Sequence, residues 1–183
     1  MINEEMNLQD KKPPRTRRFL ILFLVAGAVI ALDQFAKWWV IQNIPLNTSW
    51  LPDGLDWLSP YARLLHIKNT GASFGMFQNA NYVFIPLTAL IALGVLYYVF
   101  TLEHSNHWMW VAAGLYFGGA VGNLIDRLLI GAVTDFVSVG TFYIFNVADA
   151  SINISVALLV LLWITEHRAS QLAPTIDSET THE

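Results

Sequence analysis

Two long apolar runs constrain this chain more than any other feature of its sequence. Phe19 to Val40 is 22 residues long with only two charged residues, and Tyr82 to Leu102 is 21 residues long with none. A helix rises about 1.5 Å per residue, so ~20 residues cross a hydrocarbon layer about 30 Å thick. Two weaker runs, Trp108 to Ile125 and Val147 to Thr165, have similar lengths. The sequence therefore predicts four transmembrane helices.

Composition excludes several other classes of protein. Apolar residues make up 55% of the chain and charged residues 13%, whereas a soluble domain typically has about 25% charged residues. The absence of cysteine excludes a disulfide framework, a thiolate nucleophile and a cysteine-ligated zinc site. The five histidines are scattered along the chain, and we expect neither a metal nor another cofactor. The basic residues form no patch in a folded domain, so nucleic acid is not an expected partner.

Charge predicts the orientation of the four helices. Half of the basic residues directly precede the first apolar run, namely Lys11, Lys12, Arg15, Arg17 and Arg18. Such clusters stay in the cytoplasm, and an even number of spans returns the C-terminus to the same side. We therefore expect a cytoplasmic basic tail over 1–18, a membrane domain over 19–168 and a disordered polar tail over 169–183.

The connection over 41–81 then faces the outside and has the pattern of a small sheet. It contains the turn formers Pro45, Pro52, Gly54 and Pro60, followed by the alternating segment Tyr61 to Ile67. The expected fold class is an all-α membrane protein with four transmembrane helices and a small extracytoplasmic β-structured segment.

Small residues predict close packing of the third span. Gly114, Gly118 and Gly122 recur every four residues, so one helical face has no side chains. We interpret this face as a packing surface for another helix.

Several polar residues lie within or beside the predicted spans, where transfer into lipid is energetically unfavourable. A charged group at the centre of a span costs roughly 2.5–3.5 kcal/mol on insertion scales, so each needs a partner or a function. All of them fall near the outer boundary of the membrane: Asp33, Gln34, Lys37, Asn123, Asp126, Arg127, Asp135, Asn146, Asp149 and Asn153. This clustering indicates a functional site near the outer face.

Spacing leaves structural alternatives open for several of these residues. Asp33 and Lys37 are four residues apart and can form an ion pair on one helix face. Asn146 and Asp149 have the spacing of a helix cap. Arg127 is either an interfacial residue whose charge reaches water or the organiser of a polar network.

Asp135 and Asp149 offer a hydrolytic mechanism. Two carboxylates at one depth cannot both ionise cheaply, so one holds a proton while the other acts as a base. Such a pair can activate water against an amide bond.

Five sequence blocks, in this order and spacing, resemble the lipoprotein signal peptidases (signal peptidase II). The blocks are Asp33 with Lys37, Asn69 to Phe74, Gly122 to Arg127, Val133 to Phe136 and Phe145 to Asp149. The resemblance covers about Phe19 to Arg168 and includes the four-span layout.

This resemblance implies an aspartyl endopeptidase of the bacterial inner membrane that removes the signal peptide of prolipoproteins before a diacylglyceryl-modified cysteine. It implies that Asp135 and Asp149 are catalytic and that Asn69, Asn123, Arg127 and Asn146 line the site, with Asp33 in support. The expected partners are that prolipoprotein and membrane lipid. Two alternatives remain: a small ion- or proton-coupled transporter, because intramembrane acids also mark ion pathways, and a non-catalytic assembly factor.

Overall fold

Four long helices form the body of the computed structural model, which describes residues 15–71, 77, 80–101, 106–140 and 144–172. They are α2 (Arg15–Asn43), α3 (Asn81–Thr101), α4 (His107–Ile130) and α5 (Val147–Leu172). Each is long and apolar enough to cross a membrane, which confirms the four predicted spans.

The helix ends differ from the predicted runs by a few residues. The N-cap of α4 is Asn106, whose side chain accepts a hydrogen bond from the Trp108 amide at 3.0 Å. Its C-cap is Gly131, which has a left-handed φ of 72°. The helix α5 continues to Leu172, beyond the boundary expected at Arg168. Residues 169–172 are helical because Ala169, Gln171 and Leu172 favour helix. Of the tails predicted over 1–18 and 169–183, residues 1–14 and 173–183 lie outside the described residues.

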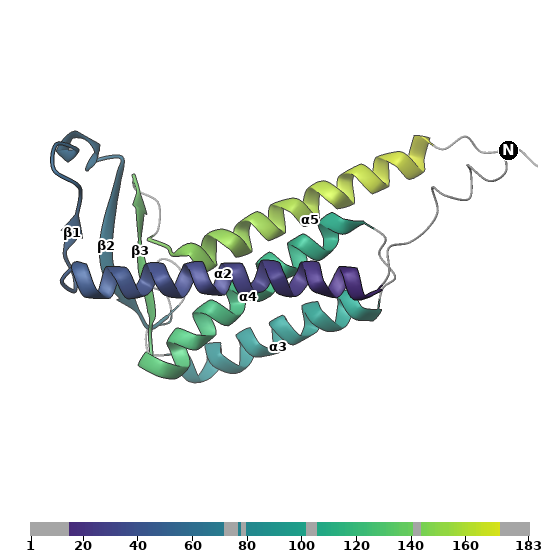
Figure 1. Cartoon of the computed structure of the whole chain (residues 1–183), viewed down its shortest axis with the longest axis horizontal. Helices are drawn as coiled ribbons and strands as arrows, with labels where there is room; N and C mark the ends of the chain where they lie inside the picture. Colours follow the sequence, from purple (N-terminus) through teal and green to yellow (C-terminus); the bar gives the residue numbers. More distant parts are fainter. Residues whose placement is uncertain (1–14, 72–76, 78–79, 102–105, 141–143, 173–183) are drawn as a thin grey trace, which may run out of the picture.

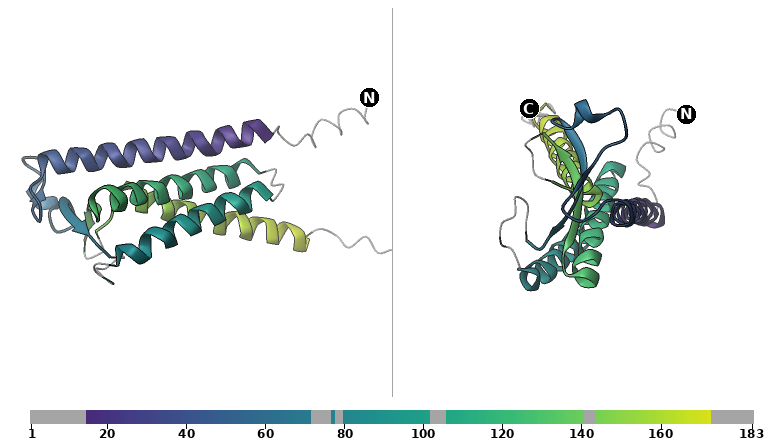
Figure 2. Two further views of the ribbon diagram at one scale, coloured as in Figure 1. Left: turned by 90° about the horizontal axis from the view of Figure 1, so that it is seen from below. Right: turned by 90° about the vertical axis from the view of Figure 1, so that its left-hand side faces the viewer.

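The helix α4 is at the centre of the bundle, with α2 on one side and α3 and α5 on its other sides (Figures 1 and 2). Glycines on α4 let the backbone of α2 approach closely. A Cβ atom on Gly114 would lie 2.8 Å from the carbonyl oxygen of Leu22, and one on Gly118 would lie 2.8 Å from that of Ala26. Because these neighbours are backbone atoms of α2, the predicted packing face of the third span is confirmed.

A three-stranded antiparallel sheet lies at one end of the bundle (Figure 1). Its strands are β1 (Ser49–Trp50), β2 (Ala62–Asn69) and β3 (Val133–Val139), with β2 in the middle. The short 3-10 helix η1 (Asp56–Leu58) lies between β1 and β2 in the chain. The sequence pattern predicts a sheet within 41–81 but does not predict β3, which follows α4. We call this end of the molecule the sheet end.

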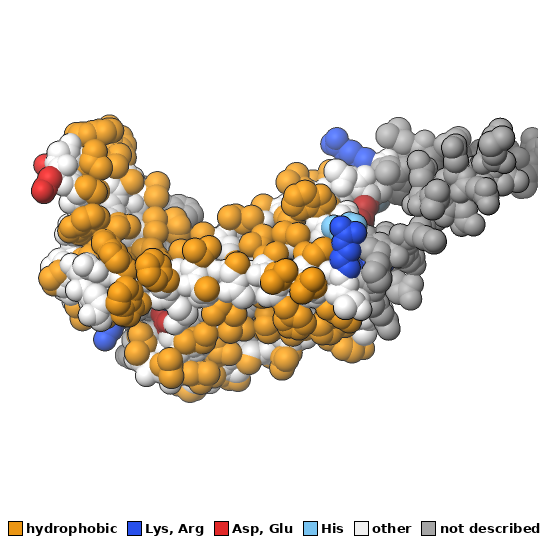
Figure 3. Space-filling view, viewed as in Figure 1, with side chains coloured by type: hydrophobic (Ala, Val, Ile, Leu, Met, Phe, Trp, Pro, Cys, Tyr) orange, Lys and Arg blue, Asp and Glu red, His pale blue; other side chains and the backbone are white. Residues whose placement is uncertain are grey.

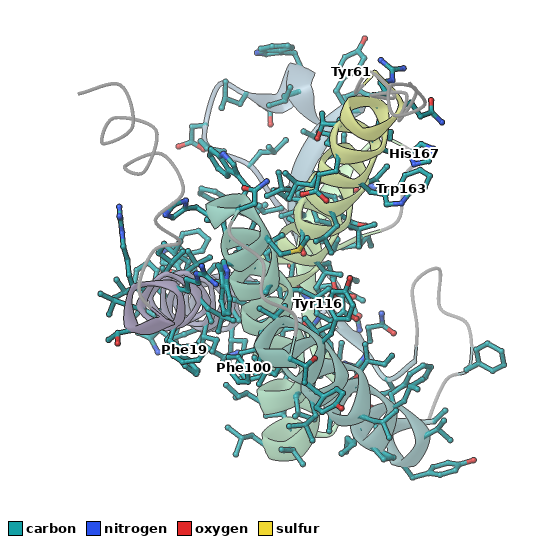
Figure 4. The ribbon with its side chains drawn as sticks, turned by 90° about the vertical axis from the view of Figure 1, so that its right-hand side faces the viewer. Phe19, Tyr61, Phe100, Tyr116, Trp163 and His167 are labelled. Atoms are coloured by element: carbon teal, nitrogen blue, oxygen red, sulfur yellow. The ribbon has the colours of Figure 1, made fainter. Side chains whose placement is uncertain are left out.

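The surface of the bundle is apolar. Figure 3 shows hydrophobic side chains along its length, with acidic and basic side chains mostly toward the two ends. Large side chains such as Leu24, Leu90 and Trp163 are more than half exposed. At the end away from the sheet, the rings of Phe19 and Phe100 pack edge to face with centroids 5.0 Å apart (Figure 4). An apolar belt between polar ends is the surface expected of a protein surrounded by lipid.

Candidate active site

A polar cavity of about 190 Å³ lies at the sheet end, where α3, α4, α5, β2 and β3 come together. It is lined by both predicted catalytic carboxylates and seven other residues: Asn69, Gly71, Phe84, Asn123, Arg127, Val133, Asp135, Ile144 and Asp149. We call it the carboxylate cavity. Asp135 and Asp149 are 14 residues apart in the chain, and the fold brings both to this one space.

The register of the sheet positions Asp135. Ile67 on β2 pairs with Asp135 on β3, so Asn69, two residues further along β2, is on the same face of the sheet. The Nδ2 of Asn69 donates to Oδ2 of Asp135 at 3.0 Å. The Nδ2 of Asn146 donates to Oδ1 of Asp135 at 2.8 Å. Both oxygens of this carboxyl group are therefore held by amides.

The environment favours the protonated form of Asp135. The residue is only 3% exposed. Its burial, together with the negative charge of Asp149, raises the pKa of Asp135 to about 7, against the hydrogen bonds from Asn69 and Asn146 and the charge of Lys37, which lower it. A carboxyl group with a pKa of about 7 is about half protonated at neutral pH, whereas an ordinary aspartate is almost fully ionised there.

Asp149 takes part in a reciprocal cap at the start of α5. Its backbone N–H donates to Oδ1 of Asn146 at 2.9 Å, and the backbone N–H of Asn146 donates to Oδ2 of Asp149 at 3.3 Å. The Nδ2 of Asn123 donates to Oδ1 of Asp149 at 2.8 Å. The hydrogen bonds of the predicted helix cap between Asn146 and Asp149 are thus present. The same Asn146 also contacts Asp135, so capping alone does not describe it.

A buried cation lies behind the carboxylate cavity. Lys37 on α2 is 2% exposed, and its Nζ is 2.8 Å from Oδ2 of Asp33 and 3.1 Å from Oδ2 of Asp126. This Nζ also donates to Oδ1 of Asn123 at 3.1 Å, which turns the Nδ2 of Asn123 toward Asp149. The ion pair predicted from the spacing of Asp33 and Lys37 is therefore present, and it belongs to a larger network.

Each carboxylate bound to Lys37 also holds the backbone beside one of the two cavity aspartates. Oδ1 of Asp33 accepts a hydrogen bond from the N–H of Ala148, directly before Asp149, at 2.9 Å. Oδ2 of Asp126 accepts one from the N–H of Thr134, directly before Asp135, at 2.9 Å. One lysine thus connects the two chain segments that carry the pair.

Arg127 faces the carboxylate cavity from the last turn of α4. Its Nη2 is 3.5 Å from the carbonyl oxygen of Gly71, and its guanidinium carbon is 5.5 Å from the ring centroid of Phe84. Its charge also interacts with Asp149, Asp135 and Asp126. These contacts favour the organising role over the interfacial one.

The predicted residues do not all face the cavity. Asn69, Asn123 and Arg127 line it together with the two aspartates. Asn146 contacts Asp135 from beside it, and Asp33 lies behind it on Lys37. Asn153 is not among the residues that line the cavity, and its Nδ2 donates to the backbone oxygen of Asp149 at 3.0 Å.

Sequence reasoning missed some contributors. The roles of Lys37 and Asp126 as a shared support were not predicted, and neither was the aromatic wall at Phe84. One sequence signal could have pointed to this contact: Lys37 and Asp126 both lie near the predicted outer boundary of the membrane. Over the described parts of the chain, no group of three or more histidines and acidic residues has an arrangement that would hold a metal ion.

Known proteins with similar sequences and folds agree on one family. The model of the family described as signal peptidase (SPase) II matches residues 25–165. A lipoprotein signal peptidase from Shouchella clausii (strain KSM-K16) is 37% identical over 140 residues, which cover 76% of this chain and 89% of that protein. One from Geobacillus thermodenitrificans (strain NG80-2) is 34% identical over 148 residues, with coverages of 79% and 89%.

Two solved structures described as a bacterial membrane enzyme have the same fold. The first has a TM-score of 0.73 at 26% identity, and the match covers 88% of this chain and 94% of that one. The second has a TM-score of 0.69 at 29% identity, with coverages of 78% and 91%. With its four apolar helices and these relatives, this chain is a multi-pass bacterial membrane protein that belongs to the signal peptidase II family of aspartic proteases.

Proposed function

We propose that this chain removes the signal peptide of diacylglyceryl-modified prolipoproteins by cleaving before the lipidated cysteine. The observation that carries the proposal is the pair Asp135 and Asp149 lining one cavity at the end of the bundle. The names of the relatives support the substrate class. A cavity beside an apolar belt also suits a substrate that arrives through the lipid.

In the proposed mechanism a water molecule attacks the scissile carbonyl directly. Asp149, as the anion, takes a proton from the water, and Asp135 transfers its proton to the leaving amine. The pKa of about 7 at Asp135 supports this assignment, as do the N–H donors from Asn123 and Asn146 to Asp149. No covalent intermediate forms, and the Lys37 network keeps both carboxyl groups in position.

The pKa of Asp135 predicts how the reaction depends on pH. A general acid must hold its proton, so kcat/KM should fall as the pH rises above about 7, approaching tenfold per pH unit. Because the folded-state pKa exceeds its ordinary value of 3.8, the folded protein binds more protons between these two values. The free energy of unfolding should therefore decrease as the pH rises through this window. Cleavage rates and thermal unfolding between pH 4 and pH 9 test both trends, and a flat rate profile would contradict the role of Asp135.

Arg127 gives a second prediction. Its planar group interacts with the Gly71 carbonyl, the Phe84 ring and two catalytic carboxylates, a geometry that lysine does not reproduce. We expect Arg127→Lys to lose activity by about tenfold or more despite keeping the charge, which corresponds to roughly 1.4 kcal/mol. The control is Arg63→Lys, at an exposed position on β2. Equal turnover by the two variants would assign Arg127 to an interfacial role.

We further propose that both termini face the cytoplasm and that the sheet end faces the outside. The basic cluster before α2 and the even number of spans support this orientation. Reporter fusions after Trp50 should therefore report an external location, and fusions after Leu172 a cytoplasmic one. An external signal after Leu172 would invert the topology and put the catalytic pair on the wrong face.

The alternative functions make different predictions in one assay. Purified protein incubated with a lipid-modified prolipoprotein should release the signal peptide and the shortened lipoprotein. A transporter or an assembly factor would leave that substrate intact. Against a transporter, α3 and α5 hold no fully buried ionisable residue among the described residues. On α2 and α4, Arg18 lies at the end away from the sheet, and Asp33, Lys37 and Asp126 lie toward the sheet end. No buried ionisable residue of the described chain therefore lies between these two ends.

A further inference from the structure

A second cavity is lined by the same three helices, α3, α4 and α5, that contribute to the carboxylate cavity. It has a volume of about 360 Å³ and is lined by α3, α4 and α5, with Leu90, Gly94, Ala113 and Leu159 among its walls. Its lining is almost entirely apolar. Both α3 and α5 pack against α4, and contacts between α3 and α5 are sparse among the described residues, so a seam remains between them. We call this second space the apolar cavity.

On each of the three helices, a residue that lines one cavity is ten residues away from a residue that lines the other. Phe84, Asn123 and Asp149 line the carboxylate cavity, one from each helix. Ten residues further from the sheet end, Gly94, Ala113 and Leu159 line the apolar cavity. Ten helical residues rise about 15 Å, so the apolar cavity lies about 15 Å deeper in the membrane on each helix.

One face of α4 runs from the apolar cavity to the carboxylate cavity. Ala113, Tyr116, Ala120 and Asn123 are spaced by three, four and three residues, which puts them on one helical face. Tyr116 projects from α4 toward the space between α3 and α5 (Figure 4). Another face of α4 is closed, because Gly114 and Gly118 lie against the backbone of α2.

We propose that the apolar cavity binds the apolar segment of the signal peptide, at residues about six to ten before the scissile bond. This inference rests on the proposed function. A helical signal segment covers 15 Å in about ten residues. If its last three residues are extended at about 3.3 Å each, six or seven residues are enough. Side chains such as Leu or Phe suit the lining, and the open position at Gly94 leaves room for one of them.

The position of the cavity favours the signal segment over a membrane lipid. The chain before the scissile bond has to leave the carboxylate cavity into the bilayer, and the apolar cavity lies deeper in the bilayer on the same three helices. The acyl chains are attached to the cysteine after the bond, so they start on the other side of the cleaved amide. One substrate can therefore occupy both cavities at once.

Gly94 provides a direct test by blocking the cavity. A Cβ atom added at Gly94 meets no atom within 4 Å, so Gly94→Phe should fold while its ring occupies the seam. Gly27 on α2 is equally exposed and equally unobstructed, which makes Gly27→Phe the matched control. For a full-length prolipoprotein, Gly94→Phe should raise KM by about tenfold with a smaller effect on kcat, because the lost contact is remote from the chemistry. Gly27→Phe should keep the wild-type KM.

A short substrate separates this inference from the proposed function. A diacylglyceryl lipopeptide with three residues before the cysteine spans only about 10 Å and cannot reach the apolar cavity. Gly94→Phe and wild type should cleave it at equal rates. If Gly94→Phe processes the full-length substrate with the wild-type KM, the inference is wrong although the protease assignment stands. If the wild type cleaves neither substrate, the proposed function fails and the inference with it.

Crosslinking locates the occupant independently of activity. The chain has no cysteine, so Gly94→Cys in an Asp135→Asn background presents a single thiol. Substrates with one added cysteine seven or fourteen residues before the scissile bond should form a disulfide with it at position seven and not at fourteen. Gly27→Cys should form neither. Equal crosslinking at both substrate positions, or none, would mean that membrane lipid occupies the cavity and would overturn the proposal.

Discussion

Replacing Lys37 with methionine is expected to destabilise the protein by about 3–5 kcal/mol and to abolish cleavage. Methionine has a similar length but no charge, so the carboxylates of Asp33 and Asp126 would remain buried without their cation. These carboxylates also bind the backbone beside Asp149 and Asp135. Thermal unfolding in detergent and a prolipoprotein cleavage assay measure the two effects.

Two further variants separate this network from a general effect of removing a lysine. Lys68→Met, at an exposed position on β2, should leave stability and cleavage unchanged. Lys37→Met combined with Asp33→Asn restores the net charge of the cluster and should recover part of the lost stability. A melting temperature for Lys37→Met equal to that of the wild type would show that the buried lysine is not needed to hold the two carboxylates.

The spans were predictable from the sequence because their signal is local. An apolar run of about 20 residues has few alternatives to a transmembrane helix. The glycine face of α4 was predictable for the same reason, since three glycines at a spacing of four leave one helical side bare. The strand β3 was not predictable, because its short segment between Gly131 and Gly140 becomes a strand only by pairing with β2.

The site shows the same division between local and distant information. The motif blocks identified Asp135, Asp149 and the amides around them. The shared lysine was not identified, because the spacing within α2 reveals only its pair with Asp33. Its contact with Asp126 joins residues 89 positions apart and depends on how α2 packs against α4. Such contacts between helices leave no pattern in one sequence.

The two aspartates of the carboxylate cavity are expected to be individually indispensable for cleavage. Asparagine has nearly the same shape as aspartate, but it neither takes a proton from water nor donates one as an acid. Asp135→Asn and Asp149→Asn should each abolish cleavage. Asp149→Asn should lose at most about 1 kcal/mol of stability from the start of α5. Asp135→Asn should stay folded, because it removes a carboxyl group that burial and Asp149 disfavour as an anion.

The matched control is Asp53→Asn, an exposed carboxylate in the connection between β1 and β2. It changes the same chemical group outside the carboxylate cavity, so it should cleave and unfold as the wild type does. An interpretation of Asp149 as only a capping residue makes the opposite prediction for its variant. In that case Asp149→Asn would lose a little stability and still cleave.

The most direct measurement is therefore cleavage of a diacylglyceryl-modified prolipoprotein by purified Asp135→Asn, Asp149→Asn and Asp53→Asn, with the melting temperature of each variant recorded in the same detergent. We expect no signal peptide release by either cavity variant, normal release by Asp53→Asn, and folded protein in all three cases. Turnover by either cavity variant, or a loss of cleavage fully accounted for by unfolding, would contradict the assignment of that aspartate.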